Sequence, residues 1–169
     1  MGRAGILRED ERLELIGGEI IEMAAIGSRH AACVGFFLDW LVRHLPMTAA
    51  VRVQDPIRLP PGSEPEPDIA VVRRRADFYA TAHPGPDDVL LLIEVADTSL
   101  TYDRDVKMPL YAAAGIPELW LVDLTQDRVE VFRDPVDGHY RSVKVLARGD
   151  ILTPTAFPDL AIPCDEIFP

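Results

Sequence analysis

A carboxylate interrupts the most apolar stretch of the chain. Glu94 lies within residues 89–96, where all the other residues are Val, Leu, Ile or Ala. Such a run is typical of a strand that is buried on both faces. An ionised carboxylate that leaves water costs several kcal/mol unless it is paired, hydrogen-bonded or bound to a metal. The sequence therefore predicts that a cation lies beside Glu94.

A second carboxylate stands at the start of another apolar strand, expected at residues 67–72. By the two-residue period of a strand, Asp68 shares a face with Ala70 and Val72. Carboxylates are the ligands that Mg²⁺ and Mn²⁺ prefer, and such a metal can polarise a phosphate and activate a water. Spacing alone does not distinguish this pair from ordinary acidic residues. Burial of both carboxylates by pattern is what favours a functional site.

Lys107 is the candidate cation. In the helix expected at residues 102–114, Asp103, Lys107 and Tyr111 recur every four residues and so follow one side. A lysine ammonium there could hold an attacking water or stabilise a developing charge. The alternatives are a structural ion pair with Glu94 or an ordinary helix pair with Asp103.

The elements that must position these residues follow from periodicity and turn signals. Gly17-Gly18 predicts a hairpin over residues 11–24, and Ser28 is expected to cap a helix that ends before Pro46. That helix carries His30 on its inward stripe, as either a core group or a catalytic one. Pro109 requires the lysine helix to begin late or to bend. Further strands are expected at residues 50–59 and 119–122, and a second hairpin at 128–132 and 140–146 around Asp137-Gly138. The Glu94 strand and the 119–122 strand should form a parallel crossover unit. Residues 157–169 are expected to form an irregular tail.

Composition bounds the class of protein. With 169 residues, of which 48% are hydrophobic, we expect a single domain over residues 1–169. The 28 acidic and 17 basic residues give a net charge of −11, which argues against a broad basic surface for nucleic acid. The arginines at 73–75 form a local basic strip or a solvated strand end. Cys33 and Cys164 have no metal-ligand spacing, and no leader or membrane-spanning run is expected, so a cytoplasmic protein is the default.

Several segments together resemble the Uma2 family of restriction endonucleases, within the PD-(D/E)xK nuclease superfamily. The resemblance covers roughly residues 11–123 and is carried by EPDIAVV, by LLIEVADTSLTYDRDVKMPLYAAAGIPELWLVD, and by LELIGGEIIEM and SRH upstream. It implies an α/β (α+β) fold with a restriction-endonuclease-like core. In such a core a central mixed sheet is flanked by helices, here with additional β-hairpins.

The resemblance also implies roles for individual residues. Asp68 and Glu94 match the metal-binding carboxylates of the motif, and the backbone carbonyl of Val95 would complete the protein's share of the coordination. Ala96 stands where the superfamily expects its lysine, and Lys107 on the following helix fills that place instead. Further matches imply that Glu19 or Asp103 contributes through a second metal or water, and that His30 and Tyr111 orient a phosphate.

We therefore expect a Mg²⁺- or Mn²⁺-dependent endonuclease that cleaves DNA and acts as a homodimer, with no membrane partner. The DNA substrate is implied by the resemblance and not by the composition. The leading alternative is a non-catalytic binding or regulatory module of the same fold, in which Glu94, Lys107 and Asp103 form a buried ion-pair network. A third reading keeps the site and replaces DNA by smaller phosphate esters.

Overall fold

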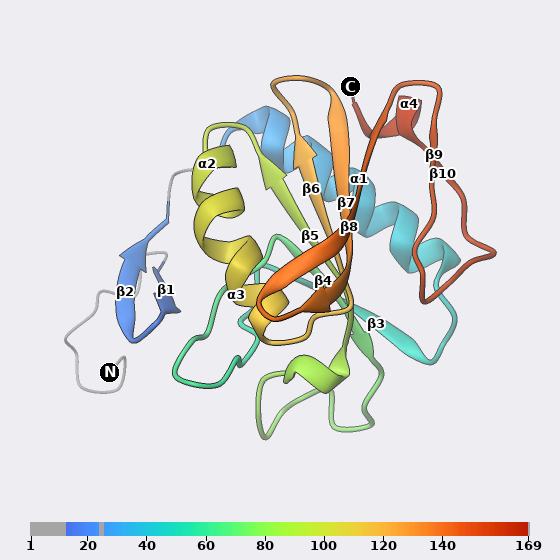
Figure 1. Cartoon of the computed structure of the whole chain (residues 1–169). Coiled ribbons are helices and arrows are strands. Elements are labelled where there is room, and N and C mark those ends of the chain that lie inside the picture. Colours follow the sequence, from blue (N-terminus) through green and yellow to red (C-terminus); the bar gives the residue numbers. More distant parts are fainter. Residues whose placement is uncertain (1–12, 24–25, 169) are drawn as a thin grey trace.

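A six-stranded mixed sheet forms the centre of the protein (Figure 1). The computed structural model describes residues 13–23 and 26–168. The strand order is β3-β4-β5-β6-β7-β8, in which β5 and β6 run parallel and the other neighbours run antiparallel. The strands are β3 (Ala49–Val53), β4 (Ile69–Arg73), β5 (Val89–Ala96), β6 (Glu118–Asp123), β7 (Arg128–Val136) and β8 (His139–Ala147).

Helices cover both faces of this sheet (Figure 1). One face packs against α1 (Ser28–His44), and the other packs against the crossover helix that joins β5 to β6. This arrangement confirms the predicted mixed sheet with flanking helices and the predicted parallel crossover. The crossover helix comprises α2 (Leu100–Tyr102), η3 (Asp103–Lys107) and α3 (Met108–Ala113), and the smaller elements are β1 (Leu13–Ile16), β2 (Glu19–Glu22), η2 (Pro86–Asp88), β9 (Ile151–Leu152), β10 (Ile162–Pro163) and α4 (Cys164–Ile167).

Alternation along β5 determines where Glu94 points. Ile93 packs in the core cluster that contains Phe37 of α1, whereas Leu92 belongs to the cluster that contains Tyr111 of α3. Successive side chains of a strand point to opposite faces, so Glu94 lies on the same face as Leu92. The strand therefore directs this carboxylate toward the crossover helix.

Both predicted hairpins are confirmed. Gly17 and Gly18 have φ values of 58° and 85°, and Asp137 and Gly138 have φ values of 51° and 76°. Two successive left-handed residues make the turn whose twist matches that of paired antiparallel strands. The parts of the first prediction that fall on Glu11, Arg12 and Ala24 lie outside the described residues.

The strand expected at residues 50–59 is shorter than predicted. β3 ends at Val53, because Gln54 adopts a left-handed φ of 53° that no regular strand accommodates. Pro56 follows and has no backbone N–H to donate to a ladder. The prediction was wrong there because the hydrophobic pattern continues beyond the point at which the backbone leaves the sheet.

The start of α1 and the C-terminal tail also differ in detail from the sequence-based expectation. Gly27 is the N-cap of α1, and Ser28, the predicted cap, is the first helical residue. The tail contains β10 and α4, which were not predicted. No helix within residues 13–23 and 26–168 is long and apolar enough to cross a membrane.

The crossover helix accommodates Pro109 through a wider turn. The η3 segment is π-helical, and the Met108 N–H donates to the carbonyl of Asp103, five residues earlier. Pro109 then lies in the first turn of α3, where its missing N–H does not interrupt that helix. The sequence predicts a helix that begins late enough to hold Pro109 in its first turn or bends there; α3 does hold Pro109 in its first turn, but helical backbone already begins at Leu100.

Candidate active site

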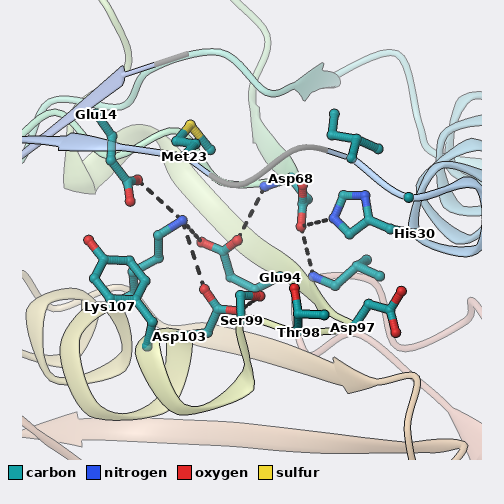
Figure 2. Close-up of a pocket in the computed structure, with 14 residues that line it drawn as sticks. Glu14, Met23, His30, Asp68, Glu94, Asp97, Thr98, Ser99, Asp103 and Lys107 are labelled. Carbon is teal, nitrogen blue, oxygen red and sulfur yellow. Dashed lines mark hydrogen bonds and ion pairs between the residues drawn. The ribbon is translucent and has the colours of Figure 1, made fainter. Parts of the chain in front are cut away.

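A pocket of about 210 Å³ opens where the start of β4 and the end of β5 lie beside the N-terminus of α1 and the crossover helix (Figure 2). Its lining is unusually rich in carboxylates. Besides backbone and neutral side chains, the lining contains Glu14, His30, Asp68, Glu94, Asp97, Asp103 and Lys107.

Asp68 is held by donors from three segments that are distant in sequence. Its Oδ2 lies 2.9 Å from the backbone N of Val95 and 3.0 Å from Nε2 of His30, and its Oδ1 accepts from Nε2 of Gln54 over 3.2 Å. Burial opposes ionisation, but the hydrogen bonds and the charge of His30 hold the pKa of Asp68 below its ordinary value. Asp68 is therefore an ionised, fixed carboxylate at neutral pH.

Glu94 accepts hydrogen bonds on both of its oxygens. Tyr111 donates its hydroxyl to Oε1 over 2.6 Å, and the backbone N–H of Asp68 donates to Oε2 over 3.4 Å. The Nζ atom of Lys107 lies 3.4 Å from Oε1. Burial raises the pKa of Glu94 to about 8, although the Lys107 charge opposes this shift.

The Lys107 ammonium lies among three carboxylates (Figure 2). Its Nζ is 3.2 Å from Oε2 of Glu14, 3.4 Å from Oε1 of Glu94 and 4.0 Å from Oδ1 of Asp103. Burial works against its charged form, yet these carboxylates raise the pKa of Lys107 above its ordinary value. Lys107 therefore stays protonated across the physiological range.

The pKa values of Lys107 and Glu94 are both raised, but burial is the main cause for Glu94 and the surrounding carboxylates are the cause for Lys107. Five carboxylates line the pocket, whereas Lys107 and His30 are the basic side chains among its described lining residues. The ammonium is consequently stabilised, while burial keeps a proton on Glu94 to higher pH; burial also raises the pKa of Asp103. A pocket with more buried carboxylates than cations favours the entry of a further cation.

The donors fit a hard divalent cation that retains some of its water. Asp68 and Glu94 offer carboxylate oxygens, and Val95 lines the same pocket. Among residues 13–23 and 26–168, no three His, Cys, Asp or Glu side chains converge as a complete metal group. Mg²⁺ is commonly bound by one or two carboxylates together with water and substrate phosphate. The residues present suit such a site and do not suit a closed zinc or calcium cage.

Most of the predicted site residues lie together. Asp68, Glu94, Val95, Asp103, His30 and Lys107 all line the pocket. Tyr111 lies behind Glu94, fully buried, and is not part of the lining. Glu19 is exposed on β2 and also lies outside the lining. The structure therefore does not bring these two residues to the position where a substrate would bind.

Sequence reasoning missed Glu14 and Gln54. Glu14 is only 4% exposed and interrupts the apolar run of β1, which is the same signal that singled out Glu94 in a longer run. No pattern identified Gln54, which reaches Asp68 because the backbone turns sharply after β3.

The arginines at 73–75 lie away from the pocket. Arg73 ends β4, and Asp68 precedes the other end of the same strand. Arg75 pairs with Asp77 over 2.8 Å, and Arg73 donates to the backbone carbonyl of Asp87 over 3.2 Å. These contacts fit the reading of this segment as a solvated strand end.

Comparisons with known proteins agree with this architecture. The model of the Uma2 family, described as "Putative restriction endonuclease", matches residues 4–165. The fold is similar to a crystal structure described as a putative nuclease belonging to DUF820 from Anabaena variabilis, with 18% sequence identity and a TM-score of 0.77. That similarity covers 98% of this chain and 94% of the other. No relative is found among curated proteins.

Proposed function

The chain belongs to the Uma2 family, and from this membership and the geometry of the pocket we propose that it is a Mg²⁺- or Mn²⁺-dependent endonuclease that hydrolyses DNA. The observation that carries the proposal is the 3.4 Å contact between Lys107 Nζ and Glu94 Oε1. It brings an ammonium from the crossover helix to the motif carboxylate, although the motif position itself holds Ala96. A lysine displaced along the chain would in this way supply the ammonium that the proposed chemistry requires.

Each residue has a role that its contacts support. Asp68, Glu94 and the Val95 carbonyl would hold the cation, and His30 fixes the orientation of Asp68 through the 3.0 Å contact. A divalent cation in such a site supplies Lewis-acid activation of the phosphate and of the attacking water. Lys107 keeps its proton and stabilises the negative charge that develops on the phosphate.

Tyr111 and Asp103 support this arrangement from behind. The Tyr111 hydroxyl orients Glu94, and Asp103, itself bonded to Ser99 Oγ over 2.5 Å, lies 4.0 Å from the Lys107 ammonium. We therefore assign Tyr111 to positioning and not to substrate contact. Glu19 has no part in the proposed mechanism.

DNA is proposed as the substrate on the strength of the family description. The net charge of −11 gives no general attraction for a polyanion, so the affinity must come from a bound cation and from local contacts. Smaller phosphate esters would meet the same chemistry in the pocket. Incubation with nucleotide esters beside plasmid DNA separates the two substrate classes.

Cleavage of supercoiled plasmid in the presence of Mg²⁺ or Mn²⁺ tests the proposal. Asp68→Ala should lower the rate by about 100-fold or more, because it removes one of two carboxylate ligands. Asp39→Ala is the matched control, since Asp39 is exposed on α1 and pairs with Arg43. Equal cleavage by wild type, Asp68→Ala and Asp39→Ala would contradict the assignment of the site.

A non-catalytic module is the second candidate, and the ion contacts of Lys107 favour it. An ammonium that already lies near three carboxylates neutralises part of their charge without any metal. Calorimetric titration with Mn²⁺ separates the two candidates. A nuclease should bind the ion and lose binding in Asp68→Ala, whereas a folded protein that takes up no ion and cleaves neither substrate class would be the module.

We also propose that the enzyme acts as a homodimer. Cutting both strands of a duplex usually takes two active sites, and a two-fold dimer supplies them with matched orientation. Light scattering during size-exclusion chromatography measures the mass in solution. A protein that makes double-strand breaks while remaining monomeric would contradict this proposal.

A further inference from the structure

Of the described carboxylates around the Lys107 ammonium, Glu14 lies closest to it. The distance between Glu14 Oε2 and Lys107 Nζ is 3.2 Å, compared with 3.4 Å to Glu94 and 4.0 Å to Asp103. Glu14 belongs to β1, in a hairpin separate from the central sheet, whereas Lys107 lies on the crossover helix. Two elements distant in sequence therefore meet at one buried ion pair.

The chain around Glu14 is fixed on the body of the protein. Leu15 and Glu64 exchange backbone hydrogen bonds of 3.3 Å and 2.7 Å, and the Gly17 N–H donates to Ser63 Oγ over 2.8 Å. The backbone N–H of Glu66 donates to the same Glu14 oxygen that contacts the lysine, over 3.4 Å. These bonds hold the carboxylate at a defined place beside the pocket.

The position of this ammonium affects the metal site. Figure 2 shows Lys107 between Glu14 and Glu94, with Asp68 on the far side of Glu94. An ammonium that settled fully on Glu94 would compete with a divalent cation for the same carboxylate. A second carboxylate on the opposite side draws the ammonium away from that contact.

We propose that Glu14 is a positioning residue, which holds the Lys107 ammonium between the hairpin and Glu94 and so keeps Glu94 available to a divalent cation. This inference rests on the proposed function. It gives the β1–β2 hairpin a role in metal affinity that does not require contact with the metal. Without Glu14, the ammonium would move onto Glu94 and the metal would bind less tightly.

Mn²⁺ titration of the whole chain by calorimetry tests the inference. Glu14→Gln should weaken Mn²⁺ binding by about tenfold or more, as is usual when a group that orients a ligand is lost. In the Lys107→Gln background the same substitution should change the Mn²⁺ affinity far less, because no ammonium remains that could move onto Glu94. Equal effects of Glu14→Gln in both backgrounds would overturn the inference, since Glu14 would then act only through its charge.

Asp97→Asn is the charge control. Asp97 lines the same pocket, and its side chain makes no hydrogen bond or ion pair with any other described residue. Its substitution removes one negative charge and should have the same effect whether or not Lys107 is present. An effect of Asp97→Asn that depends on Lys107 as strongly as that of Glu14→Gln would also overturn the inference.

Glu14→Asp keeps the test decisive if the Lys107 variants do not fold, which circular dichroism would reveal. Aspartate retains the charge but is one methylene shorter, so it loses the contact. Weakened Mn²⁺ binding in Glu14→Asp supports the inference, and wild-type binding overturns it. If the wild-type protein binds no Mn²⁺, both the proposed nuclease function and this inference fail. If Mn²⁺ binds equally well with and without Glu14, only this inference fails.

Discussion

The ring of Tyr111 is fully buried, and its hydroxyl donates a hydrogen bond to Glu94 over 2.6 Å. Tyr111→Phe keeps the ring and removes only this donor. At about pH 9, above the pKa of about 8 that burial gives Glu94, the acceptor is a buried ionised carboxylate, and we expect a loss of about 1.5–3 kcal/mol in the free energy of unfolding. Urea denaturation followed by circular dichroism measures the change.

Tyr140→Phe is the matched control for that measurement. The Tyr140 hydroxyl donates to the neutral backbone carbonyl of Ile116 over 3.0 Å. We expect its loss to cost about 0.5–1.5 kcal/mol, which is the usual range for a neutral hydrogen bond. Equal costs for the two substitutions would show that the charge of Glu94 does not strengthen its bond to Tyr111.

The residues of the site could be predicted unevenly from the sequence. Glu94 could be identified because β5 is an apolar strand of eight residues, and a charged residue inside such a strand has few structural explanations. Glu14 carries the same signal within a strand of four residues, where the pattern is too short to distinguish a buried face. The family resemblance points to Glu19, which is exposed on β2.

At the scale of elements, α1 contains a glycine that no contact requires. Gly35 lies on the exposed side of α1, has a helical backbone, and an added methyl group would meet no atom within 4 Å. Gly35→Ala should therefore stabilise the protein by about 0.5–1 kcal/mol, because alanine loses less backbone entropy in a helix. Thermal denaturation by calorimetry measures this gain.

In the hairpin between β1 and β2, the backbone conformation requires a glycine, unlike at Gly35. Gly18 has a φ of 85°, a conformation that costs an L-residue about 1–2 kcal/mol. Gly18→Ala should lower stability although an added methyl group would again meet no atom within 4 Å. A stabilising effect of both alanines would mean that backbone conformation does not govern the hairpin turn.

Elements with a complete local signal were predictable. Both hairpins follow from glycine-containing turns, and the crossover follows from a helical pattern between two apolar strands. The end of β3 was not predictable, because the left-handed Gln54 is set by its contacts with Asp68 and not by its own propensity. The π-helical turn before Pro109 could be expected only as an irregularity. Proline excludes a regular α-helix at that point but does not determine which backbone conformation replaces it.

On the scale of the whole molecule, the packing of the β1–β2 hairpin against residues 62–66 escaped prediction. The contacts are backbone hydrogen bonds between Leu15 and Glu64 and between Gly18 and Gly62. Every residue but proline can make such bonds, so the sequence carries no mark of the partner. The buried pair of Glu14 and Lys107 depends on this packing, which is why the site was predicted without one of its carboxylates.

The charge excess of the pocket should make the stability of the whole molecule depend on pH and on divalent metal. The pKa of Glu94 rises from 4.5 to about 8 on folding, so its contribution to stability is present below pH 4.5 and is lost as pH increases toward 8. Asp68 has a lowered pKa and acts in the opposite direction, but only as pH falls below its ordinary value of 3.8. Within the part of the chain that the structure describes, the charged or titratable side chains with the largest effect on Glu94 are those of Lys107, Asp103, Asp68 and Tyr111.

Metal-free wild-type protein should therefore unfold at a lower temperature at about pH 8 than at about pH 5. Glu94→Gln isolates this contribution, because glutamine keeps the volume of the side chain and does not titrate. The unfolding temperature should therefore depend less on pH in this variant.

Mg²⁺ should raise the unfolding temperature of wild type more at the higher pH, where binding no longer has to displace a proton from Glu94. Scanning calorimetry with EDTA or with excess Mg²⁺ measures both effects. A Mg²⁺ shift that is equal at the two pH values, or equal in wild type and Glu94→Gln, would place the cation away from Glu94 and remove the basis for assigning this carboxylate as a ligand.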